Sequence, residues 1–252
     1  MARQKQRIDD FLVEIGLAKD LAHARALILA GKVVTSSRKI MFPSEIVTQK
    51  DSLRVKGAPK FVGRGGDKLD SVLDLFGIRQ LLKGKVVLDV GASTGGFTDC
   101  LIQSEVAKVI AIDVGYNQLA WKLRNNKSVI HLEKTDIKNF SHPLSKEISF
   151  VFADVSFTSL SRLAPFFDKI NQVPSLCLVL LVKPQYELFR SEVPEGGIIN
   201  SIKDQEKALD RVIKNFKKYS FETIQVEKSK VLGAKGNQEF FCYMKRKNSD
   251  GS

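Results

Sequence analysis

Apolar and polar positions follow two different patterns along the chain, and the pattern changes near residue 60. In the first part, apolar residues recur at helical spacing and predict two short helices. The first helix begins near Asp9 and is closed by Gly16, and the second has Asp20 as its N-cap and Gly31 just past its end. Short apolar runs then predict strands at 33–34, 46–47 and 53–55. We therefore expect a compact α+β unit over residues 1–60.

Beyond residue 60 the pattern becomes an alternation of apolar strands and amphipathic helices. Residues 61–66 contain several glycines, and we interpret them as a linker. Five apolar runs predict strands at 85–90, 108–113, 129–132, 148–153 and 176–182. Helices are expected at 97–104, 117–124 and 204–219, and closing strands at 221–226 and 239–244. This order predicts an α/β fold over residues 61–252, with a mostly parallel Rossmann-like sheet, helices on both faces and an antiparallel last strand.

Charge gives a first functional indication, because the chain of 252 residues carries a formal net charge of +12. Residues 1–60 hold twelve Lys and Arg against six Asp and Glu, so half of the excess lies in less than a quarter of the chain. A positive field attracts polyanions such as RNA, DNA and anionic membrane surfaces. The most apolar run, at 176–182, is too short to span a bilayer, and the charged residues 1–10 lack the apolar core of an export signal. We therefore expect no membrane partner.

The cysteines and histidines do not have the spacing of metal ligands. Cys100, Cys177 and Cys242 lie far apart in the sequence, and none of them belongs to a C-x-x-C pair. Such isolated cysteines are typical of a reducing compartment. We expect a cytoplasmic protein without a bound metal.

Motifs in the first unit resemble a known RNA-binding module. Arg7-Ile8-Asp9, Ala30-Gly31-Lys32-Val33 and Pro43-Ser44 are similar to the S-four domain, which takes its name from a ribosomal protein and recurs in RNA-modifying enzymes. Asp20-Leu21 and Thr35-Ser36-Ser37 depart from the Ser-Arg and Val-Asn-Gly that the family usually has there. The resemblance implies phosphate contacts from basic side chains. The candidates, the last of them just beyond the unit, are Arg7, Lys32, Arg38, Lys39 and Arg64.

The sharpest local motif is a strand that leads into a glycine-rich turn and then a helix. It has the pattern G-x-x-x-G-G from Gly91 onward. Glycines let a ligand approach the backbone, and a helix N-terminus offers N–H groups to an anion. Ser93 stands where a dinucleotide-binding turn has its second glycine, which favours a ligand with a small carboxylate over a pyrophosphate. The candidate ligand-binding residues are Asp89, Gly91, Ala92, Ser93, Thr94, Gly95, Gly96, Phe97 and Thr98.

Acidic residues after the next three strands extend this candidate site. Asp113 ends the second strand of the sheet, 22 positions after Gly91, where a carboxylate can accept both ribose hydroxyls of a nucleotide. Asp136-Ile137 follows the third strand and Asp154 ends the fourth. The carboxyl ends of parallel strands meet at one edge, where open α/β sheets bind their ligands. For Asp136, an ordinary N-cap remains the alternative.

Two lysines and two acids form a second constellation. Lys68 follows Arg64-Gly65-Gly66-Asp67, Asp154 and Lys183 each end an apolar strand, and Glu239 opens the last strand. In kind and order these four resemble the Lys-Asp-Lys-Glu tetrad of FtsJ-like ribose 2′-O-methyltransferases. Together with the S-four-like unit, the chain resembles the TlyA/hemolysin A family over nearly all of residues 7–245.

This resemblance implies a methyltransferase with a defined substrate and donor. The target would be a cytidine ribose 2′-hydroxyl of ribosomal RNA, the donor S-adenosylmethionine, and the partners ribosomal RNA or ribosomal subunits. The tetrad residues would be catalytic, the glycine turn, Asp113 and Asp154 would hold the donor, and Asp136-Ile137 would hold its adenine edge. Which nucleotides are modified, and in which oligomeric state, stays open at this point.

The chemistry explains why such a tetrad is needed. A ribose hydroxyl is a poor nucleophile near neutral pH, so a base must take its proton as the oxygen attacks. Lys183 is our candidate base, although an ordinary lysine is charged at neutral pH. Burial, or the neighbouring cation of Lys68, would favour its neutral form, while Asp154 and Glu239 would orient the two lysines. Phe157, three residues past Asp154, is a candidate for stacking on a flipped nucleotide, with core packing as the alternative.

Other functions remain open from the sequence. A membrane-active hemolysin would suit the family name, but the sequence shows neither a spanning segment nor an export signal. A catalytically silent RNA-binding or assembly factor is disfavoured by the intact glycine turn and tetrad. A base nitrogen as target is disfavoured because Asp154-Val155-Ser156-Phe157 replaces the Asn/Asp-Pro-Pro-aromatic motif of many such enzymes.

Overall fold

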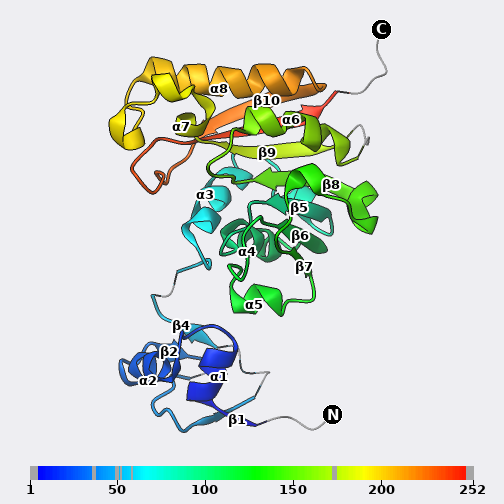
Figure 1. Cartoon of the computed structure of the whole chain (residues 1–252). Helices are drawn as coiled ribbons and strands as arrows, with labels where there is room; N and C mark the ends of the chain where they lie inside the picture. Colours follow the sequence, from blue (N-terminus) through cyan, green and yellow to red (C-terminus); the bar gives the residue numbers. More distant parts are fainter. Residues whose placement is uncertain are drawn as a thin grey trace. The chain divides into compact units, whose positions relative to one another are not determined.

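The computed structural model describes residues 5–35, 38–48, 51, 53–57, 59–171 and 175–247. Ser36 and Ser37, part of one departure from the S-four pattern, lie outside the described residues. The chain divides into two compact units (Figure 1). The first consists of residues 1–60 with 120–125, and the second of residues 61–119 with 126–252. Within the described ranges, no helix has both the length and the apolar character needed to cross a membrane.

The first unit combines two helices with two pairs of short strands. These elements are β1 (Gln6–Arg7), α1 (Ile8–Glu14), α2 (Leu21–Leu29), β2 (Val33–Val34), β3 (Ile46–Val47) and β4 (Arg54–Val55), and the segment 120–125 adds the short helix α5 (Trp121–Arg124). β1 pairs antiparallel with β3, and β2 pairs antiparallel with β4. Ile8, Leu12 and Ile28 lie in the shared core of helices and strands. The expected helices and strands are confirmed, whereas β1, with two residues, is too short to give a periodic signal.

Local chemistry sets the limits of both helices. The side chain of Asp20 accepts a hydrogen bond from the His23 N–H at 2.7 Å and so caps the start of α2. Gly16 and Gly31 adopt left-handed backbone angles, φ +72° and +65°, just after α1 and α2. Glycine tolerates this conformation without strain, so each helix stops where the sequence predicted.

The interpretation of residues 61–66 as a linker is wrong, because helix α3 (Arg64–Leu73) already begins within them and Phe61 is buried. The glycines serve packing instead. A Cβ at Gly66 would overlap the ring of Phe61, and a Cβ at Gly96 would lie 2.8 Å from the backbone N of Gly66. Glycine at both positions therefore lets α3 lie directly against the start of the next helix.

Seven strands form the sheet of the second unit, in the order β10-β11-β9-β8-β5-β6-β7. They are β5 (Val86–Val90), β6 (Lys108–Ile112), β7 (Val129–Leu132), β8 (Ile148–Ala153), β9 (Cys177–Val182), β10 (Phe221–Lys228) and β11 (Phe240–Arg246). Strands β5 to β9 pair in parallel, and β11 runs antiparallel to both of its neighbours. The predicted α/β class with an antiparallel last strand is confirmed.

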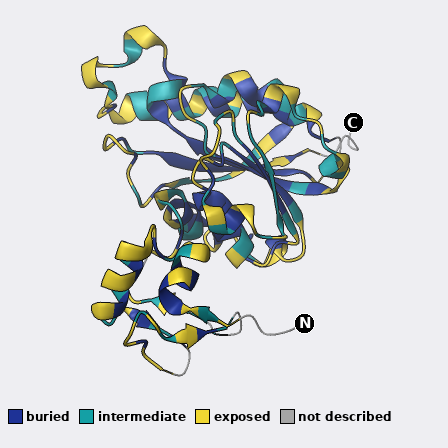
Figure 2. Cartoon of the chain, turned by 60° about the horizontal axis from the view of Figure 1, so that its bottom comes forward, coloured by how far each residue is buried: buried dark blue, intermediate teal, exposed yellow. Residues whose placement is uncertain are grey.

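Helices cover both faces of this sheet (Figure 1). α6 (Leu160–Lys169) and α8 (Ile202–Lys217) lie on one face, and α3 and α4 (Gly96–Gln103) on the other. The shorter helices of this unit are α7 (Pro184–Glu187) and the 3₁₀ turns Gln80–Leu82, Ile137–Asn139, Pro143–Glu147, Arg190–Glu192 and Glu195–Gly197. Buried residues follow the strands, and exposed residues mark the outer sides of the helices (Figure 2).

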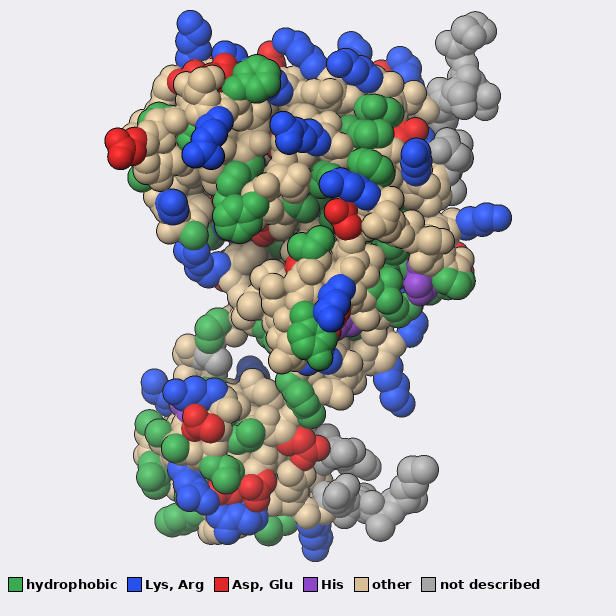
Figure 3. Space-filling model, in the orientation of Figure 1, with side chains coloured by type: hydrophobic (Ala, Val, Ile, Leu, Met, Phe, Trp, Pro, Cys, Tyr) green, Lys and Arg blue, Asp and Glu red, His purple; other side chains and the backbone are tan. Residues whose placement is uncertain are grey.

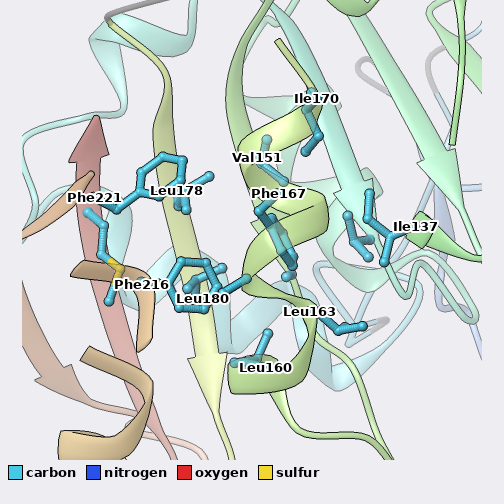
Figure 4. Packing of buried hydrophobic residues seen from close by; sticks show 14 of the residues in the cluster. Ile137, Val151, Leu160, Leu163, Phe167, Ile170, Leu178, Leu180, Phe216 and Phe221 are labelled. Carbon is cyan, nitrogen blue, oxygen red and sulfur yellow. The ribbon is translucent and has the colours of Figure 1, made fainter. Parts of the chain in front are cut away.

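A core of aromatic and aliphatic side chains joins α6 and α8 to the sheet (Figure 4). The rings of Phe167 and Phe221 both meet Phe216 edge-on, at centroid distances of 5.6 and 6.0 Å. Removing one such ring typically costs about 3–5 kcal/mol. This core fixes the carboxyl ends of β5, β6, β8 and β9, where the candidate site lies.

Candidate active site

The glycine turn between β5 and α4 is held tightly against the neighbouring strand ends. Gly91 has φ +82°, and a Cβ there would lie 2.5 Å from the backbone O of Asp154. The N–H groups of Gly91 and Ala92 both donate to the Ile112 carbonyl, at 2.9 and 3.1 Å. Gly95, with φ +97°, forms the N-cap of α4. Only glycine fits at position 91, because both the backbone angle and the space exclude a side chain.

Asp113 fixes the turn from the side of β6. Its Oδ2 accepts a hydrogen bond from the Ser93 N–H at 2.8 Å, and its Oδ1 accepts one from the Gly115 N–H at 2.7 Å. A cavity of about 440 Å³ opens beside it, and its lining includes Gly91, Ser93, Asp113, Asp136, Ile137 and Asp154. This volume lies within the usual range of small-molecule sites.

The four residues of the tetrad form two ion pairs. Lys68 Nζ lies 2.6 Å from Glu239 Oε2, and Lys183 Nζ lies 2.6 Å from Asp154 Oδ1. Both lysine side chains are at most 10% exposed. Removing charges from water is costly, so buried pairs of this kind are a weak route to stability and are often kept for another reason.

A second cavity brings the tetrad and the glycine turn together. It measures about 220 Å³ and is lined by Lys68, Asp154 and Lys183 along with residues of the turn. It shares Gly91, Ser93, Asp154 and Ser156 with the larger cavity. Three of the expected catalytic side chains thus face a cleft that continues into the expected nucleotide cavity, while Glu239 lines neither cavity and lies behind Lys68, with which it pairs.

The cavity walls separate the expected ligand-binding residues into two groups. The turn residues Ala92, Thr94, Gly96 and Phe97 line the smaller cavity, as does Arg64. Asp89, Gly95 and Thr98 line neither cavity, and their part in ligand binding stays a prediction. Asp89 and Thr98 are both 0% exposed and lie beneath the turn, while Gly95 caps the helix.

Asp89 is a buried carboxyl group with incomplete hydrogen bonding. Its Oδ2 accepts a hydrogen bond from Thr98 Oγ at 2.6 Å, while its Oδ1 has no partner among the described residues. Burial raises the pKa of Asp89 to about 7, opposed by the Thr98 hydrogen bond and assisted by the charges of Asp154 and Asp113. An uncharged Asp89 is therefore favoured over much of the acidic range.

Two of the expected RNA contacts in the first unit are already engaged in ion pairs. Arg7 pairs with the buried Asp9 at 2.9 Å, and Arg25, which the sequence did not single out, pairs with the same carboxylate at 3.0 Å. The Arg7 hydrogen bond in particular, with that of Arg25, lowers the pKa of Asp9 to about 2 against the opposing effect of burial. Arg38 pairs with Glu45. These arginines hold the unit together as well as charging its surface.

The remaining expected RNA contacts are exposed basic side chains. Lys32 and Lys39 are exposed in the first unit, and Arg64 is exposed at the start of α3 in the second. In the described part of the chain no acidic side chain forms an ion pair with Lys32, Lys39 or Arg64. Their charges are available to an outside anion.

Two polar residues that the sequence analysis missed support the Asp154–Lys183 pair. Ser156 Oγ accepts a hydrogen bond from Lys183 Nζ at 2.8 Å. Glu187, at the end of α7, accepts hydrogen bonds from the Leu160 N–H at 2.6 Å and from the Ser159 and Ser161 hydroxyls at 2.7 and 3.0 Å. The N-terminus of α6 is thus capped from a distant segment, and this ties the chain after Lys183 to the loop after Asp154. No local sequence pattern indicated that Glu187, four residues after Lys183, would cap α6.

Asn237 has a similar role beside Glu239. It is 2% exposed, its Nδ2 donates to the Gly197 carbonyl at 2.8 Å, and its Oδ1 accepts from the Ile199 N–H at 2.8 Å. The segment that follows α7 is therefore fixed to the strand that carries Glu239. The only sequence signal for a role of Asn237 was its place two residues before Glu239 in Gly236-Asn237-Gln238-Glu239.

Comparison with known proteins gives consistent matches over the whole chain. The FtsJ-like methyltransferase family matches residues 61–246. Hemolysin A from Brachyspira hyodysenteriae is 36% identical over 94% of this chain and 98% of its own length. A 16S/23S rRNA (cytidine-2′-O)-methyltransferase, TlyA from Mycobacterium tuberculosis, is 34% identical over 97% of this chain and 91% of its own length. A solved structure named as a hemolysin, from Streptococcus thermophilus, has 33% identity and a TM-score of 0.70, and the match covers 98% of this chain and 90% of that one.

Proposed function

Because the chain belongs to the FtsJ-like methyltransferase family, in its TlyA/hemolysin A branch, we propose that it methylates a cytidine ribose 2′-hydroxyl of ribosomal RNA. The observation that carries this proposal is the cleft at which Lys68–Glu239 and Lys183–Asp154 meet the glycine turn. The name of the Mycobacterium tuberculosis relative supports the choice of cytidine and of ribosomal RNA. A cytoplasmic location, where ribosomal RNA is found, is part of the proposal.

The residues around the larger cavity fit S-adenosylmethionine, which supplies a methyl group already activated by its sulfonium charge. Asp113 accepts two backbone hydrogen bonds, and a carboxylate has about four acceptor positions, so two remain for ribose hydroxyls. Gly91 leaves room that a side chain would fill. The start of α4 at Gly96 offers backbone N–H groups to a carboxylate, and Asp136-Ile137 lines the end expected for adenine.

The tetrad can supply the proton transfer that the reaction needs. Lys183 donates a hydrogen bond to Ser156 and forms an ion pair with Asp154 at 2.6 Å, and transfer of one proton across that pair would leave a neutral amine. That amine takes the hydroxyl proton while the 2′-oxygen bonds to the methyl carbon and the sulfur–methyl bond breaks, with its electrons left on sulfur. Lys68, held by Glu239, places a positive charge where negative charge develops on the 2′-oxygen.

Phe157 is suited to hold the base of the target nucleotide. It is 91% exposed, its backbone has the unusual φ of +63°, and its ring centroid lies 5.6 Å from that of Tyr186. A strained, exposed aromatic residue beside a reactive cleft is more typical of ligand binding than of packing. Stacking of the base on this ring would place the ribose toward Asp154.

We assign the first unit, residues 1–60, to RNA binding as an S-four-like domain. Exposed Lys32 and Lys39 would contact phosphates without reading sequence. Arg7 and Arg38 would contribute through guanidinium groups that are ion-paired and whose side chains are about half exposed, 46% and 52%. Arg64 would act at the start of α3, beside the cleft. The partner is ribosomal RNA, free or in a ribosomal subunit.

The test is methyl transfer to ribosomal RNA followed by mapping of the modified position. Wild-type protein with labelled S-adenosylmethionine is expected to give 2′-O-methylcytidine. Lys183→Ala is expected to abolish transfer, because the proton has no acceptor, yet to keep donor binding by calorimetry. Lys203→Ala, on the exposed side of α8, is the matched control and should keep full activity. Full turnover by Lys183→Ala would remove this lysine from the mechanism, and donor binding without any transfer by the wild type would favour a non-catalytic RNA-binding factor.

A further inference from the structure

A third and larger hollow adjoins the candidate active site. It has a volume of about 1140 Å³ and lies between the start of α6, the segment 185–197 and α8. Phe157 and Thr158 line both this groove and the 440 Å³ cavity, so the groove begins where the candidate site opens. Beyond Phe157, which the proposed function assigns to the target base, the groove has no part in substrate or donor binding as proposed above.

The charges that line the groove are mainly positive and uncompensated. Arg162, Arg190 and Lys235 are exposed, and among the described residues no acidic side chain forms an ion pair with them. The space-filling view shows basic side chains alternating with apolar ones on this unit (Figure 3). A polyanion is the natural ligand of a groove with this balance.

The other charged residues of the groove are largely neutralised within the protein. Arg211 pairs with Glu192 at 2.8 Å. Glu187 is buried and accepts hydrogen bonds from the N-terminus of α6. Glu195 is the remaining acid of the lining. Three free cations against one exposed carboxylate leave a net positive surface.

Aromatic side chains are interleaved with these cations. Phe157 and Tyr186 lie together at the entrance, and Phe189 stands further along, 66% exposed. The Arg211 guanidinium lies 4.1 Å from the centroid of the Phe189 ring and holds it in place. Exposed rings between basic side chains are typical of proteins that bind single-stranded nucleic acid, because every base can stack and every phosphate can pair.

Resting on the proposed function, we propose that this groove binds the unpaired nucleotides that flank the target cytidine. The strand would leave the cleft at Phe157, stack a base on Phe189 and place its phosphates near Arg162, Arg190 and Lys235. Continuity with the cleft favours the substrate strand over a separate partner. The charge and the exposed rings favour single-stranded RNA over a duplex, whose bases are stacked on one another.

The test uses the full-length chain and a fluorescein-labelled oligocytidine, with anisotropy measured over a series of KCl concentrations. Each phosphate contact adds about 0.7 to the slope of log affinity against log salt for a single strand, so the triple variant Arg162→Ala, Arg190→Ala, Lys235→Ala should lower this slope by about 2. The matched control removes the same charge from exposed lysines outside the groove: Lys203→Ala, Lys217→Ala, Lys218→Ala. The control should change the slope much less. Equal slopes for the two triple variants would show a general field and overturn the proposal.

A second variant tests the stacking role. Phe189→Leu should weaken oligocytidine binding by about tenfold and leave binding of a blunt RNA duplex nearly unchanged. Equal weakening of both ligands would contradict a single-strand groove. In methyl transfer, the groove variants should raise KM for ribosomal RNA while kcat and donor affinity stay unchanged. The salt slope does not depend on catalysis, so it remains informative even if the wild-type protein transfers no methyl group.

Discussion

Two aspartates, one in each unit, are completely buried, yet their acidities are opposite. Asp9 in the first unit and Asp89 in the second are both 0% exposed. Hydrogen bonds from Arg7 and Arg25 bring the pKa of Asp9 to about 2, whereas burial raises that of Asp89 to about 7. Burial alone therefore does not set the charge state of a carboxyl group; its partners do.

The two aspartates illustrate two uses of a buried carboxyl group, one in holding the fold together and one near a candidate functional site. In the first unit each buried charge is compensated by neighbours and serves the fold. In the second unit Asp89 lacks a partner for one oxygen and lies beneath the glycine turn, close to two buried lysine–carboxylate pairs. Buried polar groups without a full set of hydrogen bonds and side chains with shifted pKa values cluster at functional sites. We therefore attribute the cost of burying Asp89, in free energy of folding, to the candidate site that lies beside it.

The largest expected effect tests whether the paired lysines serve the reaction. Lys68→Ala and Lys183→Ala should each lower kcat by about a thousandfold or more, and the double variant should be little worse than either, because the tetrad acts as a unit. Single-turnover methyl transfer with saturating donor measures this. Multiplicative losses would show that the two ion pairs act independently.

The second prediction concerns the unsatisfied carboxyl group. The folded-state pKa of Asp89 is raised above the unfolded value of about 3.9, so its contribution to stability is present below pH 4 and is lost as the pH rises toward 7. Asp89→Asn removes the ionisation and should raise the free energy of unfolding at pH 8 by roughly 2–4 kcal/mol. Urea unfolding at pH 5 and pH 8 checks this: the gain should be larger at pH 8. An equal effect at both pH values would mean that Asp89 ionises normally.

The third prediction compares two glutamates of one segment. Glu187 is buried and its pKa is raised by burial, while hydrogen bonds led by Lys207 lower the pKa of Glu192 to about 2. Glu187→Ala should lower kcat by about tenfold, because the loss of an N-cap costs about 1–2 kcal/mol and frees the loop with Ser156. Glu192→Ala should leave kcat unchanged.

Donor affinity and a conservative variant separate positioning from general damage in this pair. Glu187→Gln keeps an acceptor for the Leu160 N–H and should recover most of the lost activity. Donor affinity should stay constant in all three variants. If Glu187→Ala and Glu192→Ala lose the same activity, the cap of α6 has no special part in the reaction.

The smallest effect is expected in the first unit, where the buried carboxylate of Asp9 is paired with Arg7 and Arg25. The folded-state pKa of Asp9 is lowered, so its contribution is present above pH 4 and is lost as the pH falls toward 2. Arg25→Ala should therefore cost about 1 kcal/mol near neutral pH, since half-exposed arginines are screened by water, and much less at pH 2. Amide hydrogen exchange in α1 and α2 measures the change locally. A loss that persists at pH 2 would point to packing of the arginine stem instead.

The sequence was sufficient for most of the fold, for reasons that particular residues illustrate. Asp20 and Gly31 mark the ends of α2 because capping chemistry is local. The parallel strands were predictable because their apolar runs are continuous. Helix α3 was not, since Gly65 and Gly66 are common in linkers, and only the packing against Phe61 and Gly96 explains them.

The candidate site shows the same division. The resemblance to a family motif indicated the tetrad, and the spacing from Gly91 indicated Asp113, because the ends of parallel strands meet at one edge. The ion-pair partners, the cap that Glu187 gives to α6 and the link from Asn237 to Gly197 depend on contacts between distant segments, which no local pattern encodes. The burial of Asp89 and its hydrogen bond from Thr98 were not predictable from the motif either, because a motif does not show which way a side chain points.

The glycine-to-glycine contact between α3 and the start of α4 has a mechanical consequence. Lys68 lies on α3, and the turn expected to hold the donor leads directly into α4. Because no side chain separates the two helices at Gly66 and Gly96, α3 and α4 are in direct backbone contact and are expected to move together. A displacement of the turn by as little as the width of a methyl group would therefore displace α3, and Lys68 with it. Any movement of the turn that is expected to hold the donor would therefore also move the ammonium group of Lys68.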